Sequence, residues 1–241
     1  MPKTIRYQNL VAKFKKHRFS TPELLNPHEI ENFDFDVINP WELWQGNLDA
    51  EVMLIGQDFA DSESLKNNLQ EDWQKEKSSS TNLALIDFFK ILAHPIAEIS
   101  YAGTSELPLF FTNAILGIKK SETQHMSKPV KDSWIRESRE YLKGLIDIVQ
   151  PKHIIAMGKT AYKAVCGIYG IKPTAGMKEV TGTKIRLPDG KNLFVVQHCS
   201  PLGRVGRSAE LQNADWARIG GEIKSTTATT LSTHNGKQTK Y

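Results

Sequence analysis

Four short apolar runs recur along the chain and constrain its fold more than any other feature. None of them alternates apolar with polar residues, and each ends in polar or glycine-rich residues. The runs occupy residues 52–55, 109–112, 153–157 and 193–196. Runs of this kind are typical of strands buried on both faces, as in a parallel sheet. The sequence therefore predicts a central, mostly parallel four-stranded sheet.

Helical patterns lie between and after these runs. Apolar residues repeat at helical spacing over residues 83–92, 134–149 and 211–223. Residues 184–187 and 193–195 flank a Pro-Asp-Gly-Lys turn, a hairpin signal that predicts one antiparallel strand joining the sheet. Strands alternating with helices of these lengths predict an α/β fold, a three-layer sandwich with helices flanking the sheet.

The chain divides into three segments of different composition. Residues 50–223 contain all four apolar runs and are expected to form one folded α/β domain. Residues 1–49 are predicted to be a helical and extended segment packed on that domain. Residues 224–241 are rich in Thr, Ser, Gly and Lys and hold few apolar residues, which predicts a flexible C-terminal tail.

The first twenty residues carry a strong positive charge with no acidic residue among them. Their basic side chains are Lys3, Arg6, Lys13, Lys15, Lys16 and Arg18. Apolar residues at helical spacing between them indicate a basic amphipathic helix. That helix fits either an arm that faces DNA or a membrane, or a helix at the edge of the fold with a solvated basic face. The second interpretation needs no partner, and the net charge of +4 is too small to decide between them.

Composition argues against several classes of protein. With only Cys166 and Cys199, the chain lacks the cysteines for a disulfide scaffold or a Cys-only zinc or iron–sulfur site. Its seven histidines show no spacing typical of metal ligands, so neither metal nor cofactor is expected. No apolar run approaches the ~18 residues of a membrane span, and no signal peptide follows Met1. We expect an intracellular, cytoplasmic protein with no membrane partner.

Polar residues follow three of the four runs at the positions where α/β sheets bind ligands, beyond the carboxyl ends of parallel strands. We therefore expect Asp58, Asn113 and His198 to share one rim of the sheet. A carboxylate, an amide and an imidazole suit an enzyme that activates water, recognises a planar polar ligand and stabilises an anion. Taken singly, the three have plainer explanations as a helix cap, a turn residue and a structural histidine.

The sequence Gly158-Lys159-Thr160 follows the third run and is similar to the end of a phosphate-binding loop. That motif requires a glycine five residues earlier, where His153 stands, so we interpret the segment as the start of a helix. The first amides of such a helix, together with Lys159, still suit a DNA phosphate.

Three segments together resemble the motifs of the uracil-DNA glycosylase superfamily. They are Ile-Gly-Gln-Asp-Phe at residues 55–59, Phe-Thr-Asn-Ala at residues 111–114 and His-Cys-Ser-Pro-Leu-Gly-Arg at residues 198–204. The helix–strand–glycine segment at residues 134–161 is similar to that family as well. The likeness covers roughly residues 50–222, with the motifs in the family's order, and it implies the family's α/β fold.

The resemblance implies a catalytic pair. Asp58 matches the acidic residue that orients or activates the attacking water and stabilises positive charge on the deoxyribose. His198 matches the histidine that donates a hydrogen bond to the uracil oxygen as the base leaves. Cleavage of an N-glycosidic bond produces an oxocarbenium-like sugar and an anionic base, so a carboxylate and a prepositioned donor address the two developing charges.

The resemblance also implies how the substrate is bound. The base-binding residues are Gly56, Gln57 through its backbone amide, Phe59 or another aromatic as the stacking ring, and Asn113 at the uracil edge. The turn at Ser200, Pro201 and Leu202 would press the DNA backbone, with Leu202 as the wedge that keeps the nucleotide flipped out. The phosphate contacts would be Lys159, Arg204 and Arg207.

The chain departs from the family pattern at several positions. Phe59-Ala60-Asp61 stands where Pro-Tyr-His is usual, which implies that the steric block against thymine is missing or supplied elsewhere. Gly117 and Ser138 stand near where two cluster cysteines would fall, so no iron–sulfur cluster is expected. Outside candidates for the stacking aromatic are Trp41 and Trp44.

The leading hypothesis is a monomeric, monofunctional DNA glycosylase that removes uracil, or a related deaminated base, by base flipping and leaves an abasic site without any cofactor. One alternative is a catalytically silent module that binds uracil-containing or damaged DNA through the same pocket. Another is an enzyme of the same fold that acts on a free nucleoside or nucleotide. The sequence alone does not select the base.

Overall fold

The computed structural model describes residues 1–31, 33, 36, 38, 48–59, 61–70, 80–93, 109–121, 129–173 and 176–235. Residues 67–70, 201, 202, 204 and 226–235 are described by their backbone alone.

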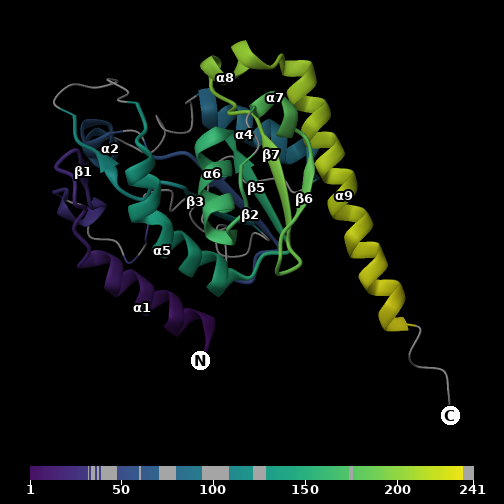
Figure 1. Ribbon diagram of the computed structural model, residues 1–241, viewed down its shortest axis with the longest axis horizontal. Coiled ribbons are helices and arrows are strands. Elements are labelled where there is room, and N and C mark those ends of the chain that lie inside the picture. Colours follow the sequence, from purple (N-terminus) through teal and green to yellow (C-terminus); the bar gives the residue numbers. More distant parts are fainter. Residues whose placement is uncertain are drawn as a thin grey trace.

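A five-stranded sheet forms the centre of the molecule (Figure 1). Its strands, in spatial order, are β3 (Leu109–Asn113), β2 (Val52–Gly56), β5 (His153–Met157), β7 (Asn192–Val196) and β6 (Lys184–Arg186). The first four are parallel, and β6 pairs antiparallel with β7. The mostly parallel sheet predicted from the apolar runs is thus confirmed.

The predicted count of four strands leaves out the hairpin strand, which joins the sheet as its fifth strand, as the turn signal predicted. Strand β6 joins the edge through the turn at residues 187–191. Its residues are partly or fully exposed, as expected of a short edge strand that carries charged side chains.

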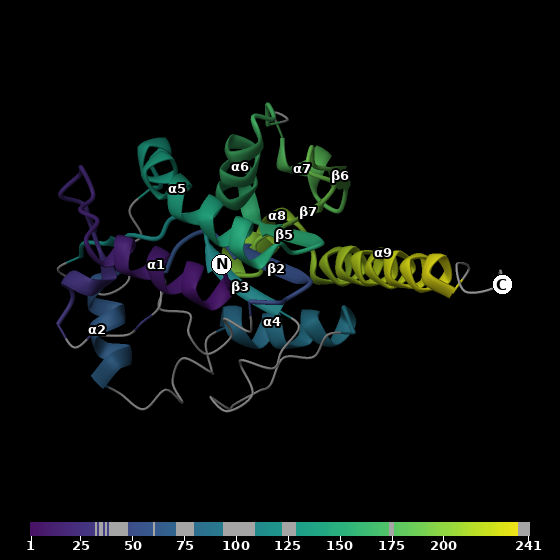
Figure 2. The same ribbon diagram turned by 90° about the horizontal axis from the view of Figure 1, so that it is seen from below.

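Helices lie on both sides of the sheet (Figure 2). The helices are α1 (Lys3–Lys15), α2 (Ser62–Gln70), α4 (Ser80–Ile91), α5 (Asp132–Val149), α6 (Gly158–Tyr169), α7 (Met177–Val180), α8 (Pro201–Gly206) and α9 (Ala209–Asn235). A separate two-stranded sheet pairs β1 (Leu24–Leu25) with β4 (Ile118–Lys119), and a short 3-10 helix, η1 (Pro27–Glu29), follows β1. Among the described residues, no helix is both long enough and apolar enough to cross a membrane.

Successive strand residues feed two separate cores. One core packs α1, α5 and α6 against one face of the sheet, where it includes Met53 and Ile55. The other packs α4 and α9 against the opposite face, where it includes Val52 and Leu54. Side chains alternate between the two faces of a strand, and helices cover both faces here. Every residue of these strands is therefore buried, which favours apolar residues at successive positions. This is the physical reason for the four unalternating runs.

Two basic residues of helix α1, Lys3 and Arg6, bond to other parts of the molecule. Lys3 donates from Nζ to the carbonyl oxygens of Leu48 and Val149, both at 2.9 Å, and Arg6 donates to the carbonyl of Asp147 at 2.9 Å. Val149 and Asp147 belong to the last turn of α5, where carbonyl groups lack helical partners and attract cations. These contacts are those of a helix docked at the edge of the fold.

Helix α9 continues past the boundary predicted at residue 224. The predicted tail is helical as far as Asn235, and Figure 1 shows the helix projecting beyond the sheet. Trp216, Ile219 and Ile223 anchor its first half in the second core. Once a helix is anchored, each further residue adds one hydrogen bond, and residues 222–235 contain neither glycine nor proline to stop it.

Candidate active site

The parallel strands bring the predicted site residues to one rim of the sheet. Asn113 ends β3 and pairs in register with Gly56, the last residue of β2. Asp58 follows β2, and His198 follows β7. The ends of β3 and β7 lie roughly 14 Å apart along the rim, because neighbouring strands are about 4.8 Å apart. The carboxylate, amide and imidazole therefore lie along one short edge.

The first two rim loops are bonded to each other. The amide of Ala114 donates to the Gly56 carbonyl, and the amide of Ile115 donates to the Gln57 carbonyl, each at 2.9 Å. These bonds continue the ladder between β2 and β3 past the ends of the strands. Asp58 and Asn113 are thus positioned by a rigid pair of chains.

Asp58 is a buried carboxylate with a cationic partner. Its side chain is 10 % exposed, and its Oδ2 lies 3.2 Å from Nζ of Lys119, whose side chain is 6 % exposed. The Gln57 amide also donates to this Oδ2, at 3.3 Å. Burial raises the pKa of Asp58 above its usual value, and the attraction of Lys119 and the hydrogen bonds from Lys119 and Gln57 offset only part of that rise.

Gln57 is held by helix α6. The hydroxyl of Thr160 donates to Gln57 Oε1 at 2.8 Å, which leaves the Gln57 NH₂ group facing Asp58. The residue expected to meet the base through its backbone thus also supports the Asp58 carboxylate through its side chain.

Asn113 is buried, at 2 % exposure, and its Oδ1 has no hydrogen-bond partner among the described residues. A buried amide oxygen without a partner is costly, because it has given up its contact with water. A planar ligand that donates a hydrogen bond at this position would satisfy it.

His198 is set up as a neutral hydrogen-bond donor. The amide of Ser200 donates to His198 Nδ1 at 3.1 Å, so the proton of a neutral imidazole lies on Nε2. Burial lowers the pKa of His198 below its usual value, which keeps the ring neutral at neutral pH. Nε2–H is then available to an acceptor at the rim.

Two glycines confine His198. Gly158 has φ +87° between β5 and α6, and a Cβ there would lie 3.6 Å from the His198 Cβ. A Cβ on Gly203 would lie 2.7 Å from the His198 carbonyl carbon and closer still to its oxygen. Helix α8 therefore packs directly on the backbone of the catalytic candidate, which only glycine permits.

Helix α8 begins where the DNA-pressing turn was expected. Ser200 caps it, since its hydroxyl accepts from the Gly203 amide at 3.4 Å, and Pro201 occupies the first turn. The backbones of Leu202 and Arg204 lie in this helix, and their side chains are outside the described set. Val205 on the same helix is 87 % exposed.

The ring of Phe59 is packed inside the molecule. Phe59 is 8 % exposed and packs with Ile30, Phe33, Leu65 and Ile118, so little of its ring faces the rim.

Arg207 donates from Nε and Nη2 to the two carboxylate oxygens of Asp215, which also accepts from Arg218. By contrast, Lys159 is exposed at the start of α6, as a phosphate contact requires. Trp41 and Trp44 lie outside the described residues.

The described residues contain no group of three or more His, Cys, Asp or Glu side chains arranged to hold a metal ion. Both cysteines are buried, and the Cys199 thiol contacts the Met157 sulfur and the Thr81 carbonyl.

A cleft of about 310 Å³ lies at the opposite, amino edge of the sheet, between Pro151 and the β6–β7 turn. It is separate from the rim that holds Asp58.

Chemically, the rim supplies a buried carboxylate, an unsatisfied amide and a neutral imidazole donor. These groups can bind the edge of a planar polar ring, stabilise an anion on it and act on water or a cation beside it.

The chain matches the family model of the uracil DNA glycosylase superfamily over residues 43–219. No curated protein matches it. The matched residues include β2, β3, β5, β7 and the rim that they form, and they make up most of the chain. On this evidence the chain belongs to the uracil DNA glycosylase superfamily.

Proposed function

We propose that this protein is a monofunctional DNA glycosylase that hydrolyses the N-glycosidic bond of uracil, or of a related deaminated base, in DNA. Membership of the superfamily supports a DNA glycosylase-like function in general. The observation that carries the finer proposal is the buried Asn113 amide oxygen without a partner, on the same rim as Asp58 and His198.

Each group then has a role in bond cleavage. Asn113 accepts a hydrogen bond from the ring N–H of the flipped base and donates to a neighbouring carbonyl. As the bond between the sugar C1′ and the base nitrogen breaks, its electron pair moves onto the base, and Nε2–H of His198 donates to the developing oxyanion. Asp58 stabilises the positive sugar, orients the water whose oxygen bonds to C1′ and accepts the proton that this water loses.

The neutral state of His198 suits this role. A neutral donor can stabilise an anionic base in a buried site without a buried imidazolium, which burial disfavours. Because leaving-group stabilisation by one fixed donor is typically worth about 10²–10³ in rate, His198→Ala is expected to be slower by a factor of that order.

The decisive experiment uses end-labelled single- and double-stranded oligonucleotides that carry one uracil. Alkali cleaves the strand wherever the purified protein has left an abasic site. We expect cleavage by the wild type and by Asp87→Asn, a matched change at an exposed aspartate of α4. Asp58→Asn should abolish most of it.

Other outcomes point to the two alternatives. Tight, uracil-dependent gel shifts without strand cleavage would replace the glycosylase by a binding module. Base release from free nucleosides or nucleotides but not from DNA would replace it by a small-molecule hydrolase. Equal cleavage by wild type and Asp58→Asn would remove Asp58 from the proposed mechanism.

A further inference from the structure

Lys119 pairs with the Asp58 carboxylate, and neither the motifs nor the family resemblance single it out. Its Nζ lies 3.2 Å from Asp58 Oδ2, and both side chains are almost completely buried. Within the described part of the chain, it is the one cationic group in ion-pair contact with Asp58. A lysine is rarely buried to this extent unless it is paired.

The fold fixes Lys119 from both sides. On one side it pairs with Leu24 of β1, and the next residue donates its amide to the Glu23 carbonyl at 2.8 Å. On the other side its backbone forms a bridge with Asp61. Two hydrogen bonds of 3.1 and 3.2 Å between Ser62 Oγ and the backbone of Ser121 close the same seam. Strand β4 is thus bound to the loop that holds Asp58.

The contacts on Asp58 are divided unequally between its two oxygens. Lys119 and Gln57 both reach Oδ2, while Oδ1 receives no hydrogen bond from the described residues. One oxygen is anchored, and the other is left for water or for the sugar. A carboxylate that rotated freely would lose this distinction.

The charge on Asp58 depends on few groups. Burial favours its neutral acid, and a neutral acid can neither stabilise a cation nor take up a proton. Asp61, buried three residues further on and engaged by the Ser64 amide, has the same sign and would oppose ionisation. Lys159 follows the neighbouring strand β5 and His198 follows β7, one strand further away, and no ion pair joins either of them to Asp58 in the described structure.

We propose that Lys119 is a positioning residue: its ammonium favours the ionised form of the buried Asp58 carboxylate and anchors Oδ2, so that Oδ1 acts on the water and the sugar. The inference rests on the proposed glycosylase function for its catalytic meaning. The charge-holding part stands on the ion pair alone.

The test compares three variants. Lys119→Met removes the charge, Lys119→Gln keeps a hydrogen-bond donor without charge, and Lys119→Arg keeps the charge. Lys120→Met, at the exposed neighbouring lysine, is the matched control. Two quantities are measured for each: the single-turnover rate of base release across pH, and the titration of the Asp58 carboxyl carbon by NMR.

In the neutral variants the Asp58 titration should move to higher pH, and the acid limb of the rate profile should move with it. An opposite charge at this distance typically changes a carboxyl pKa by one unit or more, so base release on the acid limb, below the Asp58 pKa, should fall by up to about tenfold per unit of that change. The rate should recover as the pH rises. Lys119→Arg and Lys120→Met should follow the wild type.

An unchanged Asp58 titration in both neutral variants would overturn the inference, whatever happens to the rate. A rate lost equally at all pH values, with that titration unchanged, would show a merely structural lysine. Failure of the proposed function is distinguishable, because a wild type that releases no base can still show the Asp58 titration moving in the variants. If Lys119→Met does not fold, Lys119→Gln decides.

Discussion

Asp58 and Asp189 lie at opposite edges of the same sheet, each beside a lysine, and their pKa values shift in opposite directions. Burial would raise the pKa of Asp189, but hydrogen bonds from Lys191 and Tyr169 outweigh it, and the pKa is lowered. At Asp58 burial outweighs Lys119, and the pKa is raised. The Asp189 side chain is 38 % exposed and that of Asp58 is 10 % exposed, so desolvation decides the difference.

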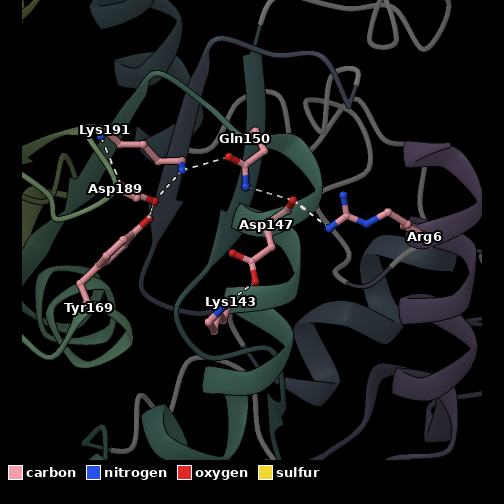
Figure 3. Close-up of polar contacts among 7 residues, drawn as sticks. All are labelled: Arg6, Lys143, Asp147, Gln150, Tyr169, Asp189 and Lys191. Carbon is pink, nitrogen blue, oxygen red and sulfur yellow. Dashed lines mark hydrogen bonds and ion pairs between the residues drawn. The ribbon is translucent and has the colours of Figure 1, made fainter. Parts of the chain in front are cut away.

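The surroundings of the two aspartates differ as much as their exposure. At the amino edge Tyr169 donates to Asp189, and Lys191 links Asp189 to Gln150 (Figure 3). Gln150 and Arg6 both donate to the Asp147 carbonyl. Each polar group in this network has a partner within the molecule. At the carboxyl edge, Asn113 Oδ1 and one oxygen of Asp58 lack a partner among the described residues. This network at the amino edge is satisfied within the molecule, whereas the carboxyl edge keeps groups available for the ligand of the proposed function.

The largest expected effect comes from two buried asparagines at the two edges. Asn113→Ala should slow base release by about 10²–10³-fold and leave the free energy of unfolding nearly unchanged, since its Oδ1 is unpaired. Asn192 accepts from Arg186 at 2.8 Å and contacts His153, so Asn192→Ala should lower the free energy of unfolding by about 1–3 kcal/mol with no change in rate. Urea unfolding and single-turnover assays measure both. A loss of stability in Asn113→Ala together with a loss of rate in Asn192→Ala would contradict the proposed difference between the two edges.

Two glycines give the next largest effect. Gly203→Ala forces α8 away from the His198 backbone, and a displacement of about 1 Å in a catalytic group can cost roughly 10²-fold in rate. Gly190 lies in the β6–β7 turn with φ +85°, so Gly190→Ala is expected to cost about 1–2 kcal/mol in unfolding free energy through strain alone. Base release by the Gly190→Ala protein should equal that of the wild type. A Gly203→Ala enzyme of full activity would show that His198 tolerates displacement.

The contrast between these edges also explains which parts of the structure the sequence could predict. The parallel strands were predictable because burial on both faces leaves continuous apolar runs, and the rim followed from where such strands end. Strands β1 and β4 hold two residues each, which is too short for any periodic signal. The burial of Lys119 could not be predicted either, because two adjacent lysines normally indicate a solvated surface.

Packing between distant segments decided the remaining differences. Phe59 follows the site aspartate directly, but its ring is taken up by a cluster that includes Ile30 and Phe33, far away in the sequence. Arg207 follows the third family-like motif, at residues 198–204, but Asp215 on the next helix engages it. No local pattern indicates either partner. The roles of Asp58, Asn113 and His198 stay predictions until the assays above are made.

The pH dependence of stability should separate the two edges. The pKa of His198 is lowered in the folded state, so its contribution is present above about pH 6.5 and is lost as pH falls towards the folded value. His17 behaves in the same way. Asp189 also has a lowered pKa, so its contribution is lost only as pH falls below about 4.

Urea unfolding across pH measures these two windows. In the wild type, the free energy of unfolding should fall by at most about 1.4 kcal/mol per pH unit between about pH 6.5 and pH 5 because of His198. In His198→Gln this fall should be smaller. Asp189→Asn should reduce the fall in unfolding free energy only below about pH 4. If the free energy of unfolding of His198→Gln falls as steeply between about pH 6.5 and pH 5 as that of the wild type, His198 is not the group responsible.

The smallest effect concerns two exposed lysines, one near each edge. Lys159, at the start of α6, lies on the rim, whereas Lys152 lies beside the amino-edge cleft and pairs with Glu51. If the carboxyl edge binds DNA, Lys159→Gln should weaken binding of a uracil oligonucleotide several-fold and reduce the slope of log K against log salt by about 1. Lys152→Gln should change neither quantity, because its edge faces away from the DNA. Since both changes remove one surface charge, Lys152→Gln controls for any loss of general attraction between the protein and DNA. A difference between their salt slopes therefore reports local phosphate contact, and equal slopes would mean that the DNA does not cross the rim at Lys159.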